Sequence, residues 1–344
     1  MKALSLEDKQ TFKIRDIKKP TISDNQVLVK VSYCGVCGSD LDRYFKGKVH
    51  YFPLILGHEF SGVIEEIGKN VHSFSAGDRV AVAPLVPCGH CENCKHGRPA
   101  HCSQYGFIGS RQNGAMAEYV AVDERNLLSI PDKVSMKEAA LIEPLTVALH
   151  GVERVHFCAG SEAVIFGAGT IGMMTLLVLK ARGAGNITVI DLNSEKLAVA
   201  NKLGATNTIN SNEVDLNEYF SNHKKPEIVF ETAGVAQTQV QSIEIVDHIG
   251  KVVYIGTANN EVDFSPKVFE QILRKEIEIR GSWMSYSTPF PGYEWSAGLQ
   301  YIEEAIIDVK PLINGIFTLE DKEKPFLKMK DPLNHSIKFL YEFE

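Results

Sequence analysis

The sequence lacks several features that would place it in a specialised class of protein. None of its apolar runs approaches the roughly 20 residues needed to span a bilayer, and it contains no internal repeat or low-complexity tract. Its first residues, MKALSLEDKQTFKIRDIKKP, are charged and lack the apolar core of a secretory signal. We therefore expect an ordinary globular protein of the cytoplasm, with no membrane partner.

The chain also lacks an excess of basic residues. It has 36 Lys and Arg against 43 Asp and Glu, and its net charge is −7. General binding to nucleic acid needs a basic face, so we expect no nucleic-acid partner, although a local patch can still bind an anion. Hydrophobic residues make up 44% of the chain and charged residues 23%, as in average globular proteins. Its 344 residues favour two domains over a single core.

Cysteine is scarce, with 7 residues in the chain, but four of them lie close together. Cys88, Cys91, Cys94 and Cys102 form the pattern C-x2-C-x2-C-x7-C. Four thiolates at such spacing can surround one tetrahedral Zn²⁺ with no open position, which makes the ion structural. A disulfide cluster is the alternative, but it is typical of small secreted chains. We therefore predict a structural zinc lobe at about residues 84–104.

Two patterns of secondary structure divide the chain. Up to about residue 132, short β segments such as Gln26–Tyr33 alternate with Gly, Pro and Asp. From about residue 161, apolar strands alternate with amphipathic helices, beginning with Ala163–Phe166 and Thr170–Arg182. This alternation predicts βαβ units around a parallel sheet, and hence an α/β fold. The Lys- and Glu-rich segment Asp321–Pro332 is predicted to be a surface loop.

A glycine-rich turn follows the first strand of the second half and reads Gly167-Ala168-Gly169-Thr170-Ile171-Gly172. Such a G-x-G-x-x-G turn between a strand and a helix can hold the pyrophosphate of a dinucleotide on the amide groups at the helix start. Asp191 ends the next strand, where a carboxylate can bind the adenosine ribose and repel a 2′-phosphate. The pattern therefore predicts NAD rather than NADP. A glycine-rich turn in an α/β domain without a nucleotide is the alternative.

Several segments, in this order, resemble the zinc-dependent medium-chain dehydrogenases. They are GVCGSD, LGHEFSGVIEEIG, AGDRVAV, the four-cysteine lobe, IEPLTVALHG and GAGTIG. The resemblance covers nearly the whole chain. It implies a GroES-like β-rich catalytic domain over residues 1–145, a Rossmann NAD-binding domain with a doubly wound parallel sheet over 146–285, and a C-terminal return to the catalytic domain over 286–344.

The resemblance also implies a second zinc site, which spacing alone does not reveal. By spacing, a lone Cys, His and Glu far apart in the chain are more often structural. The family pattern assigns Cys37, His58 and Glu143 to a catalytic zinc, with Glu59 as a further possible ligand. It makes Ser39 the first acceptor of the substrate proton.

The stretches CGSDLDRYFKGKVHYFPLILGHEFSG, YGFIGSRQNGAMAEY and ILRKEIEIRGSWMSYSTPFPGYEW resemble the polyol and polyol-phosphate branch of that family. Asp42 stands where many members have a proton-relaying histidine. Arg43 and Met284 stand where sorbitol dehydrogenases place a tyrosine and an arginine. These departures favour a substrate with an anionic end.

Arginine can bind a phosphate bidentately, so Arg43, Lys46 and Arg111 are candidate partners of a substrate phosphate. A solvated surface cation is the alternative for each. The leading hypothesis is therefore an NAD- and zinc-dependent dehydrogenase of a polyol phosphate. A dehydrogenase of a neutral polyol such as sorbitol is the alternative, and a binding protein without catalysis is a more remote one.

The strand Ile277–Gly281 is predicted to be the last of the parallel sheet. An exposed edge strand can be covered by pairing with a second copy of the chain. We therefore expect a homodimer or a homotetramer.

Overall fold

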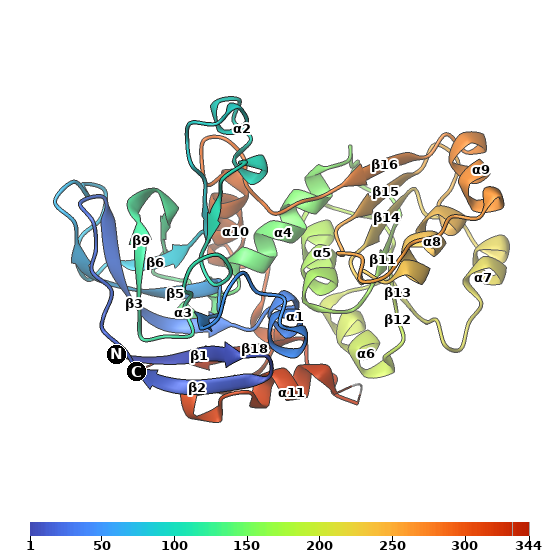
Figure 1. The fold of residues 1–344 in the computed structure, drawn as a ribbon. Helices are drawn as coiled ribbons and strands as arrows, with labels where there is room; N and C mark the ends of the chain where they lie inside the picture. The colour runs from blue at the N-terminus through green and yellow to red at the C-terminus, as the bar shows by residue number, and fades with distance from the viewer. Residues whose placement is uncertain (332, 344) are drawn as a thin grey trace. The chain divides into compact units, whose positions relative to one another are not determined.

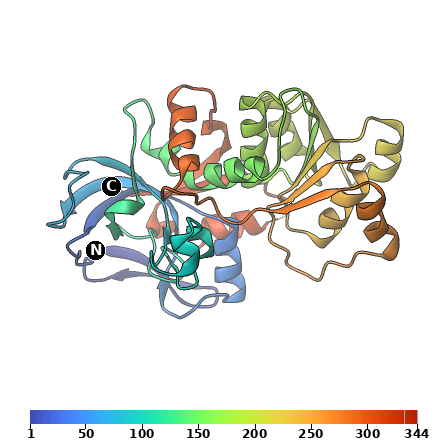
Figure 2. The same ribbon diagram turned by 90° about the horizontal axis from the view of Figure 1, so that it is seen from above.

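The computed structural model describes residues 1–331 and 333–343. The chain forms two compact units (Figure 1). Unit 1 comprises Met1–Thr146 together with the residues from Ser285 onward, and unit 2 comprises Val147–Met284. The first strand, β1, and the last strand, β18, both belong to unit 1, and the N and C marks in Figure 2 lie near them.

Unit 1 is rich in β structure. Its strands are β1 (Lys2–Asp8), β2 (Thr11–Asp16), β3 (Gln26–Gly35), β4 (Leu54–Ile55), β5 (Glu59–Ile67), β6 (Arg79–Val82), β7 (Leu85–Val86), β8 (Gly106–Phe107), β9 (Tyr119–Asp123), β10 (Leu127–Ser129), β17 (Ile313–Phe317) and β18 (Lys338–Glu342). Its helices are α1 (Gly38–Lys46), α2 (Glu92–Lys95), α3 (Met136–Ala139), α10 (Tyr293–Glu303) and α11 (Lys324–Lys330). Helix α4 (Ile142–Glu153) crosses the boundary between the units.

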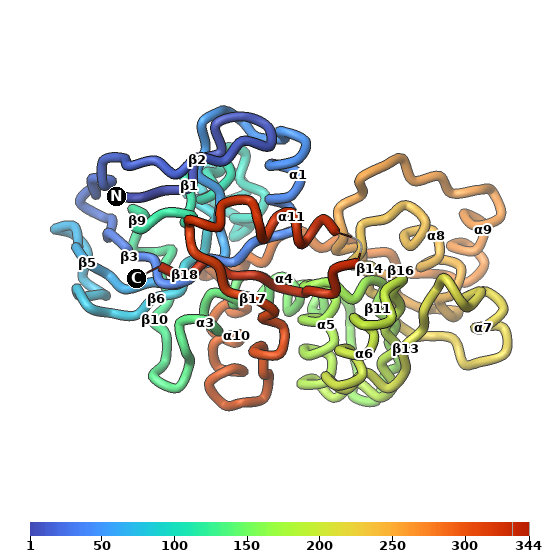
Figure 3. Tube along the Cα trace, turned by 90° about the horizontal axis from the view of Figure 1, so that it is seen from below, coloured from blue at the N-terminus to red at the C-terminus, as the bar shows by residue number. Residues whose placement is uncertain are grey.

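The main sheet of unit 1 joins distant parts of the chain. In the described residues its strand order is β10-β6-β5-β3-β18-β17, with β9 also paired to β3. Strand β3, QVLVKVSYCG, carries the apolar side chains Val27, Val29 and Val31 into the core. The C-terminal strand β18 pairs antiparallel with β3 and parallel with β17, so it joins the C-terminal part of the chain to the sheet formed by the N-terminal part (Figure 3).

Unit 2 is a doubly wound α/β domain. Its strands are β11 (Ala163–Phe166), β12 (Ile187–Asp191), β13 (Asn207–Asn210), β14 (Ile228–Glu231), β15 (Lys251–Tyr254) and β16 (Glu278–Gly281). Its helices are α5 (Thr170–Ala181), α6 (Ser194–Leu203), α7 (Leu216–Asn222), α8 (Ala236–Ile245) and α9 (Pro266–Arg274). The strands are parallel, in the order β13-β12-β11-β14-β15-β16 among the described residues.

This strand order reverses direction beside β11, which is the Rossmann arrangement. Helices α5 and α6 pack together on one face of the sheet, and α8 and α9 pack together on the other (Figure 1). The central strands β11 and β14 are buried throughout and mainly apolar, as expected where helices cover both faces. The predicted fold class, a β-rich domain with a Rossmann parallel sheet, is therefore confirmed.

Some details of the predicted elements were wrong. Strand β13 and helix α7 were missed, because NTIN has one strongly apolar residue and α7 has seven residues, although Leu216, Tyr219 and Phe220 stand at helical spacing. Most of Asp321–Pro332 is not a loop but contains α11, since Phe326 packs against the rings of Phe12 and Tyr44. Pro332 itself lies outside the described residues.

No helix within residues 1–331 and 333–343 is long and apolar enough to cross a membrane.

Candidate zinc and coenzyme sites

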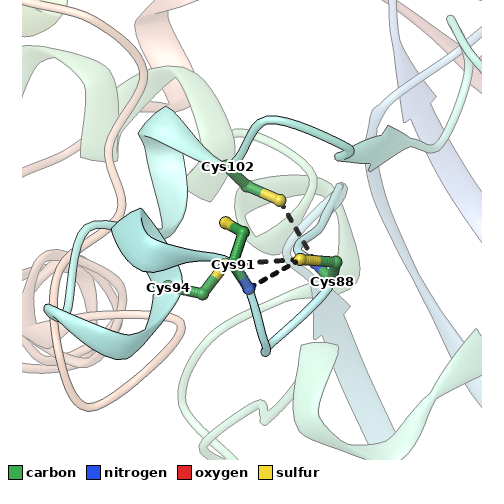
Figure 4. A group of neighbouring side chains, drawn as sticks. All are labelled: Cys88, Cys91, Cys94 and Cys102. Atoms are coloured by element: carbon green, nitrogen blue, oxygen red, sulfur yellow. Dashed lines mark hydrogen bonds between the residues drawn. The ribbon is translucent and has the colours of Figure 1, made fainter.

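The four cysteines of the lobe converge on one point. The sulfur atoms of Cys88, Cys91, Cys94 and Cys102 all lie within 4.8 Å of one another (Figure 4). Short helix α2 brings Cys91 and Cys94 together, and the following turn returns Cys102. The cysteines are free thiols, so the disulfide alternative has no support in the structure.

Backbone amides of the lobe point at these sulfur atoms. The amides of Cys88 and Gln104 donate to Cys102 Sγ at 3.3 and 3.4 Å, and the amide of Cys91 donates to Cys88 Sγ at 3.4 Å. Hydrogen bonds from the backbone amides of Cys94 and Ser103 lower the pKa of the Cys91 thiol to about 5. Such donors stabilise thiolates, which is the form that binds zinc. The donor set therefore fits one structural Zn²⁺.

A second group of metal-binding side chains lies at the start of α1 and β5. Donor atoms of Cys37, His58 and Glu59 lie within 4.8 Å of one another. Strands β3 and β5 pair antiparallel with Gly35 opposite Glu59, and this register brings the CGSD and GHE segments together. His58 and Glu59 are buried, whereas Cys37 is half-buried and Ser39 is exposed. One side of the group is therefore accessible.

Three glycines allow the backbone to place His58. Gly57 has φ +97°, a conformation that favours glycine. A Cβ on Gly109 or Gly114 would lie only 2.4 or 2.3 Å from the Gly57 carbonyl oxygen. These chain segments therefore touch without side chains between them. The ring of Phe107 meets the His58 imidazole edge to face at 5.6 Å.

Glu143 lies in the first turn of α4 and is half-buried. Its carboxylate is outside the 4.8 Å group, but it interacts electrostatically with His58, Glu59 and Cys37. Burial raises the pKa of Glu143 to about 8, and burial with the charges of Glu59 and Asp40 raises the pKa of Cys37 to about 11. Both groups are therefore mainly protonated at neutral pH unless a cation balances them.

Glu59 has a partner that sequence reasoning missed. Lys338 Nζ donates to both Glu59 carboxylate oxygens, at 2.9 and 2.7 Å, and to the carbonyl of Val36 at 3.0 Å. Each side chain is 1% exposed. Burial alone would lower the pKa of Lys338, but the negative charge of Glu59 and its hydrogen bonds raise it. The negative charge of Glu59 is thus balanced by Lys338. Glu143 has no such cationic partner among the described salt bridges.

Asp40 organises the other side of the site. It is fully buried, and its Oδ2 accepts from the Cys37 amide at 3.2 Å. Its Oδ1 accepts from Arg43 Nη1 at 2.6 Å and lies 3.6 Å from His58 Nδ1. His58 Nδ1 is buried and has no hydrogen-bond partner in the described chain. A buried imidazole nitrogen beside a thiol and two carboxyl groups fits a catalytic zinc site.

Ser39 lies next to these groups. Its hydroxyl donates to Cys37 Sγ at 3.3 Å and accepts from Arg43 Nη1 at 2.9 Å. The structure thus places Arg43 beside the serine that was predicted to accept the substrate proton.

The other two phosphate candidates have different surroundings. Lys46 forms an ion pair with Asp42 at 2.8 Å, and Lys48 pairs with the same carboxylate at 2.8 Å. These lysines lower the pKa of Asp42, so it remains ionised and is poorly suited to relay a proton. Arg111 stacks over the ring of Tyr105 at 4.2 Å.

The glycine-rich turn of unit 2 has the predicted geometry. Gly167 has φ +95°, and Gly169 caps α5, which begins at Thr170 and Ile171. A Cβ on Gly172 would lie 1.8 Å from the Gly167 carbonyl oxygen, so only glycine lets the helix approach the turn this closely. The N-terminus of α5 therefore lies directly at the turn, where the helix dipole favours an anion.

A cavity of about 350 Å³ opens at the carboxyl edge of the parallel sheet. Its lining includes Gly167, Asp191, Ala233, Val235 and Thr238. Asp191 accepts hydrogen bonds from the amides of Ala168 and Asn193 at 2.6 and 2.9 Å. Dinucleotides bind at this edge in Rossmann domains, so the cavity fits the adenosine part of the coenzyme.

The chain matches models of two known domain families. Residues 23–132 match the alcohol dehydrogenase GroES-like domain, and residues 170–303 match the zinc-binding dehydrogenase domain. The galactitol 1-phosphate 5-dehydrogenase of Escherichia coli (strain K12) is 40% identical over 292 residues, which are 84% of each chain. The chain belongs to the zinc-dependent medium-chain dehydrogenases.

Two further comparisons support this assignment. The sorbitol dehydrogenase of Bacillus subtilis (strain 168) is 36% identical over 332 residues, or 94% of this chain and 92% of the relative. The crystal structure of galactitol-1-phosphate dehydrogenase from Escherichia coli matches with a TM-score of 0.95 and 36% identity, covering 100% of both chains. The protein is therefore an oxidoreductase of the alcohol and polyol dehydrogenase family, whose cofactors are zinc and NAD(H).

We predict that Lys338→Met strongly destabilises the protein, because it leaves the Glu59 carboxylate buried without a counter-charge. The expected loss is about 3–5 kcal/mol in the free energy of unfolding, measured by denaturant titration. In the double variant Lys338→Met/Glu59→Gln both charges are removed, so the loss should be smaller than in Lys338→Met alone. An unchanged stability of Lys338→Met would contradict the importance of this pair.

We predict that zinc uptake at the second site releases protons from Glu143 and Cys37, because both are mainly protonated below pH 8 in the metal-free chain. When zinc already occupies the four-cysteine lobe, binding of a second zinc ion at pH 7 should release about two protons. The affinity of the second site for zinc should fall as pH falls. Calorimetry in buffers of different ionisation enthalpy measures this number. Glu143→Gln should release about one proton fewer, and equal release would exclude Glu143 as a ligand.

Proposed function

We propose that the protein oxidises a secondary alcohol of a polyol phosphate with NAD, in a reaction of the galactitol 1-phosphate to tagatose 6-phosphate type. The supporting observation is the position of Arg43, whose guanidinium contacts Ser39 on the helix that begins after Cys37. The likeness to galactitol 1-phosphate 5-dehydrogenase supports the same substrate class.

Cys37, His58 and Glu143 would hold the catalytic ion. Glu59 would remain a further ligand, bound to Lys338 while it does not contact the ion. When bound, zinc supplies Lewis-acid polarisation of the alcohol, and NAD supplies the hydride acceptor. Ser39 would accept the hydroxyl proton of the substrate, since its Oγ is exposed and lies 3.3 Å from Cys37 Sγ. Arg43 donates to that oxygen and orients it.

Arg43 can bind a substrate phosphate while it also holds Ser39. Its side chain is 16% exposed, and the bonds to Ser39 and Asp40 both use Nη1. Nη2 and Nε can therefore donate to a second anion in the forked geometry that phosphate favours. Lys46 lies three residues further on α1, on the same side of the helix, and Asp42 holds it there. Arg111 remains a weaker candidate because its guanidinium stacks on Tyr105.

A dehydrogenase of a neutral polyol is the second candidate. The likeness to sorbitol dehydrogenase supports it, and so does the ion pair that Arg43 already forms with buried Asp40. In that case Arg43 would only orient Asp40 and Ser39.

We also propose that the protein is a homodimer or homotetramer. Strand β16 is the outer strand of the unit 2 sheet, and three of its four residues, including Ile279, are exposed. Pairing with a second copy would cover these groups. A sedimentation mass of two or four chains is expected, and a monomer would contradict the proposal. The cytoplasmic location stays a prediction from the sequence.

We predict that Arg43→Ala weakens turnover of a phosphorylated polyol far more than that of its neutral parent. Loss of a charge-assisted hydrogen bond should lower kcat/KM for galactitol 1-phosphate by about 10–100-fold relative to galactitol. The comparison is made in the zinc-loaded protein, because the ratio cancels any effect through Asp40 or Ser39.

Lys46→Ala and Arg111→Ala test the other two phosphate candidates, and smaller changes in the ratio are expected. Lys69→Ala is the control for loss of a surface cation, because Lys69 pairs only with exposed Asp24 among the described salt bridges, and its ratio should equal that of wild type. Equal losses of Arg43→Ala on both substrates would favour the neutral-polyol candidate. Failure of wild type to oxidise either polyol would contradict the proposed substrate class.

A further inference from the structure

Glu231 is a buried acid that neither zinc site uses. It is the last residue of β14, at the carboxyl edge of the unit 2 sheet, and it is 0% exposed. Its Oε1 accepts three hydrogen bonds, from the amides of Ala233 and Gly234 at 2.9 Å each and from Thr238 Oγ1 at 2.8 Å. One oxygen thus holds the turn after β14 and the first turn of α8.

The same residue also holds the turn after the neighbouring strand β15. Its backbone carbonyl accepts from the amides of Ile255 and Gly256 at 2.9 Å each. Its Oε2 is buried without a hydrogen-bond partner among the described residues, and a Cβ on Gly256 would lie 2.8 Å from it. Glu231 therefore packs directly against both turns.

Two of the groups that Glu231 holds belong to the coenzyme cavity. Ala233 and Thr238 line the cavity of about 350 Å³ together with Gly167 and Asp191. The carboxyl group lies behind this wall, since it has no exposed surface of its own. One part of the cavity lining is therefore held in place by Glu231.

We propose that Glu231 is a positioning residue for the nicotinamide coenzyme. Its carboxyl group fixes the Ala233–Thr238 wall in the conformation that binds the dinucleotide, and it does not itself contact the ligand. This inference rests on the proposed placement of the coenzyme at the Gly167–Gly172 turn.

The hydrogen-bond pattern requires an acceptor at Oε1 but no negative charge. Burial raises the pKa of Glu231, although bonds from Thr238, Gly234 and Ala233 oppose this shift. A neutral carboxyl still accepts all three bonds at Oε1. A glutamine has the same shape and the same acceptor oxygen. Glu231→Gln should therefore preserve the wall. Glu231→Ala leaves the amides of Ala233 and Gly234 without their acceptor, whereas Thr238 Oγ1 can still donate to the Val235 carbonyl at 2.8 Å.

The test is the dissociation constant of NADH, measured by fluorescence titration of the zinc-loaded protein, together with kcat and the KM for NAD. Glu231→Ala should raise the NADH Kd about tenfold or more. The KM for NAD should rise in parallel, while kcat at saturating NAD should change less. Glu231→Gln should restore a Kd close to that of wild type.

Thr238→Val removes one of the three bonds with little change of shape, and it should raise the Kd by a smaller factor. If Glu231→Ala does not fold, the NADH Kd of Thr238→Val decides the outcome. Glu162→Ala is the matched control, because Glu162 precedes β11 at the opposite edge of the same sheet and binds Lys224 and Asn186 there. Its NADH Kd should equal that of wild type.

Wild-type Kd values in Glu231→Ala or Thr238→Val would overturn the inference. A Kd raised equally by Glu162→Ala would also overturn it, since the effect would then be general destabilisation. If wild type itself binds no NADH, the coenzyme assignment fails rather than the role of Glu231.

Discussion

The buried ion pair between Lys338 and Glu59 is the constraint on which unit 1 depends. It joins the C-terminal strand β18 to the first residue of β5, which follows His58 directly. Two charges of this kind are tolerated in a protein interior only when each satisfies the other, and here Lys338 also binds the Val36 carbonyl. The pair therefore holds the end of the chain, the β5 start and the approach to Cys37 in one arrangement.

A second constraint is the close approach of backbone to backbone at glycines. Gly57, Gly109 and Gly114 touch beside His58, and Gly172 touches Gly167 at the start of α5. In both units these contacts leave no space for a side chain, so the functional groups are positioned by main-chain geometry. Rigid main chain supports a precise site better than a flexible loop does. Buried acids, Asp40 in unit 1 and Glu231 in unit 2, then fix the neighbouring turns by hydrogen bonds.

Much of this architecture was predictable because local patterns carry it. The alternation of apolar strands and helices after residue 161 predicted β11 with its observed bounds, and Asp191 ends β12 as predicted. The cysteine spacing predicted the lobe. Strand β13 and helix α11 were not predicted, since NTIN is largely polar and α11 packs through Phe326 against Phe12 and Tyr44, which are remote in sequence. Tertiary packing outweighs local propensity in such short elements.

The sequence by itself determined the fold class, the four-cysteine lobe and the glycine-rich turn with its acid, because each depends on residues near one another in the chain. Only the tertiary structure decided which partners the charged groups of the site take. Lys338 lies 279 residues from Glu59, and Arg43 turns to Asp40 and Ser39 rather than to solvent. Such pairings leave no local pattern, since they follow from strand register and burial.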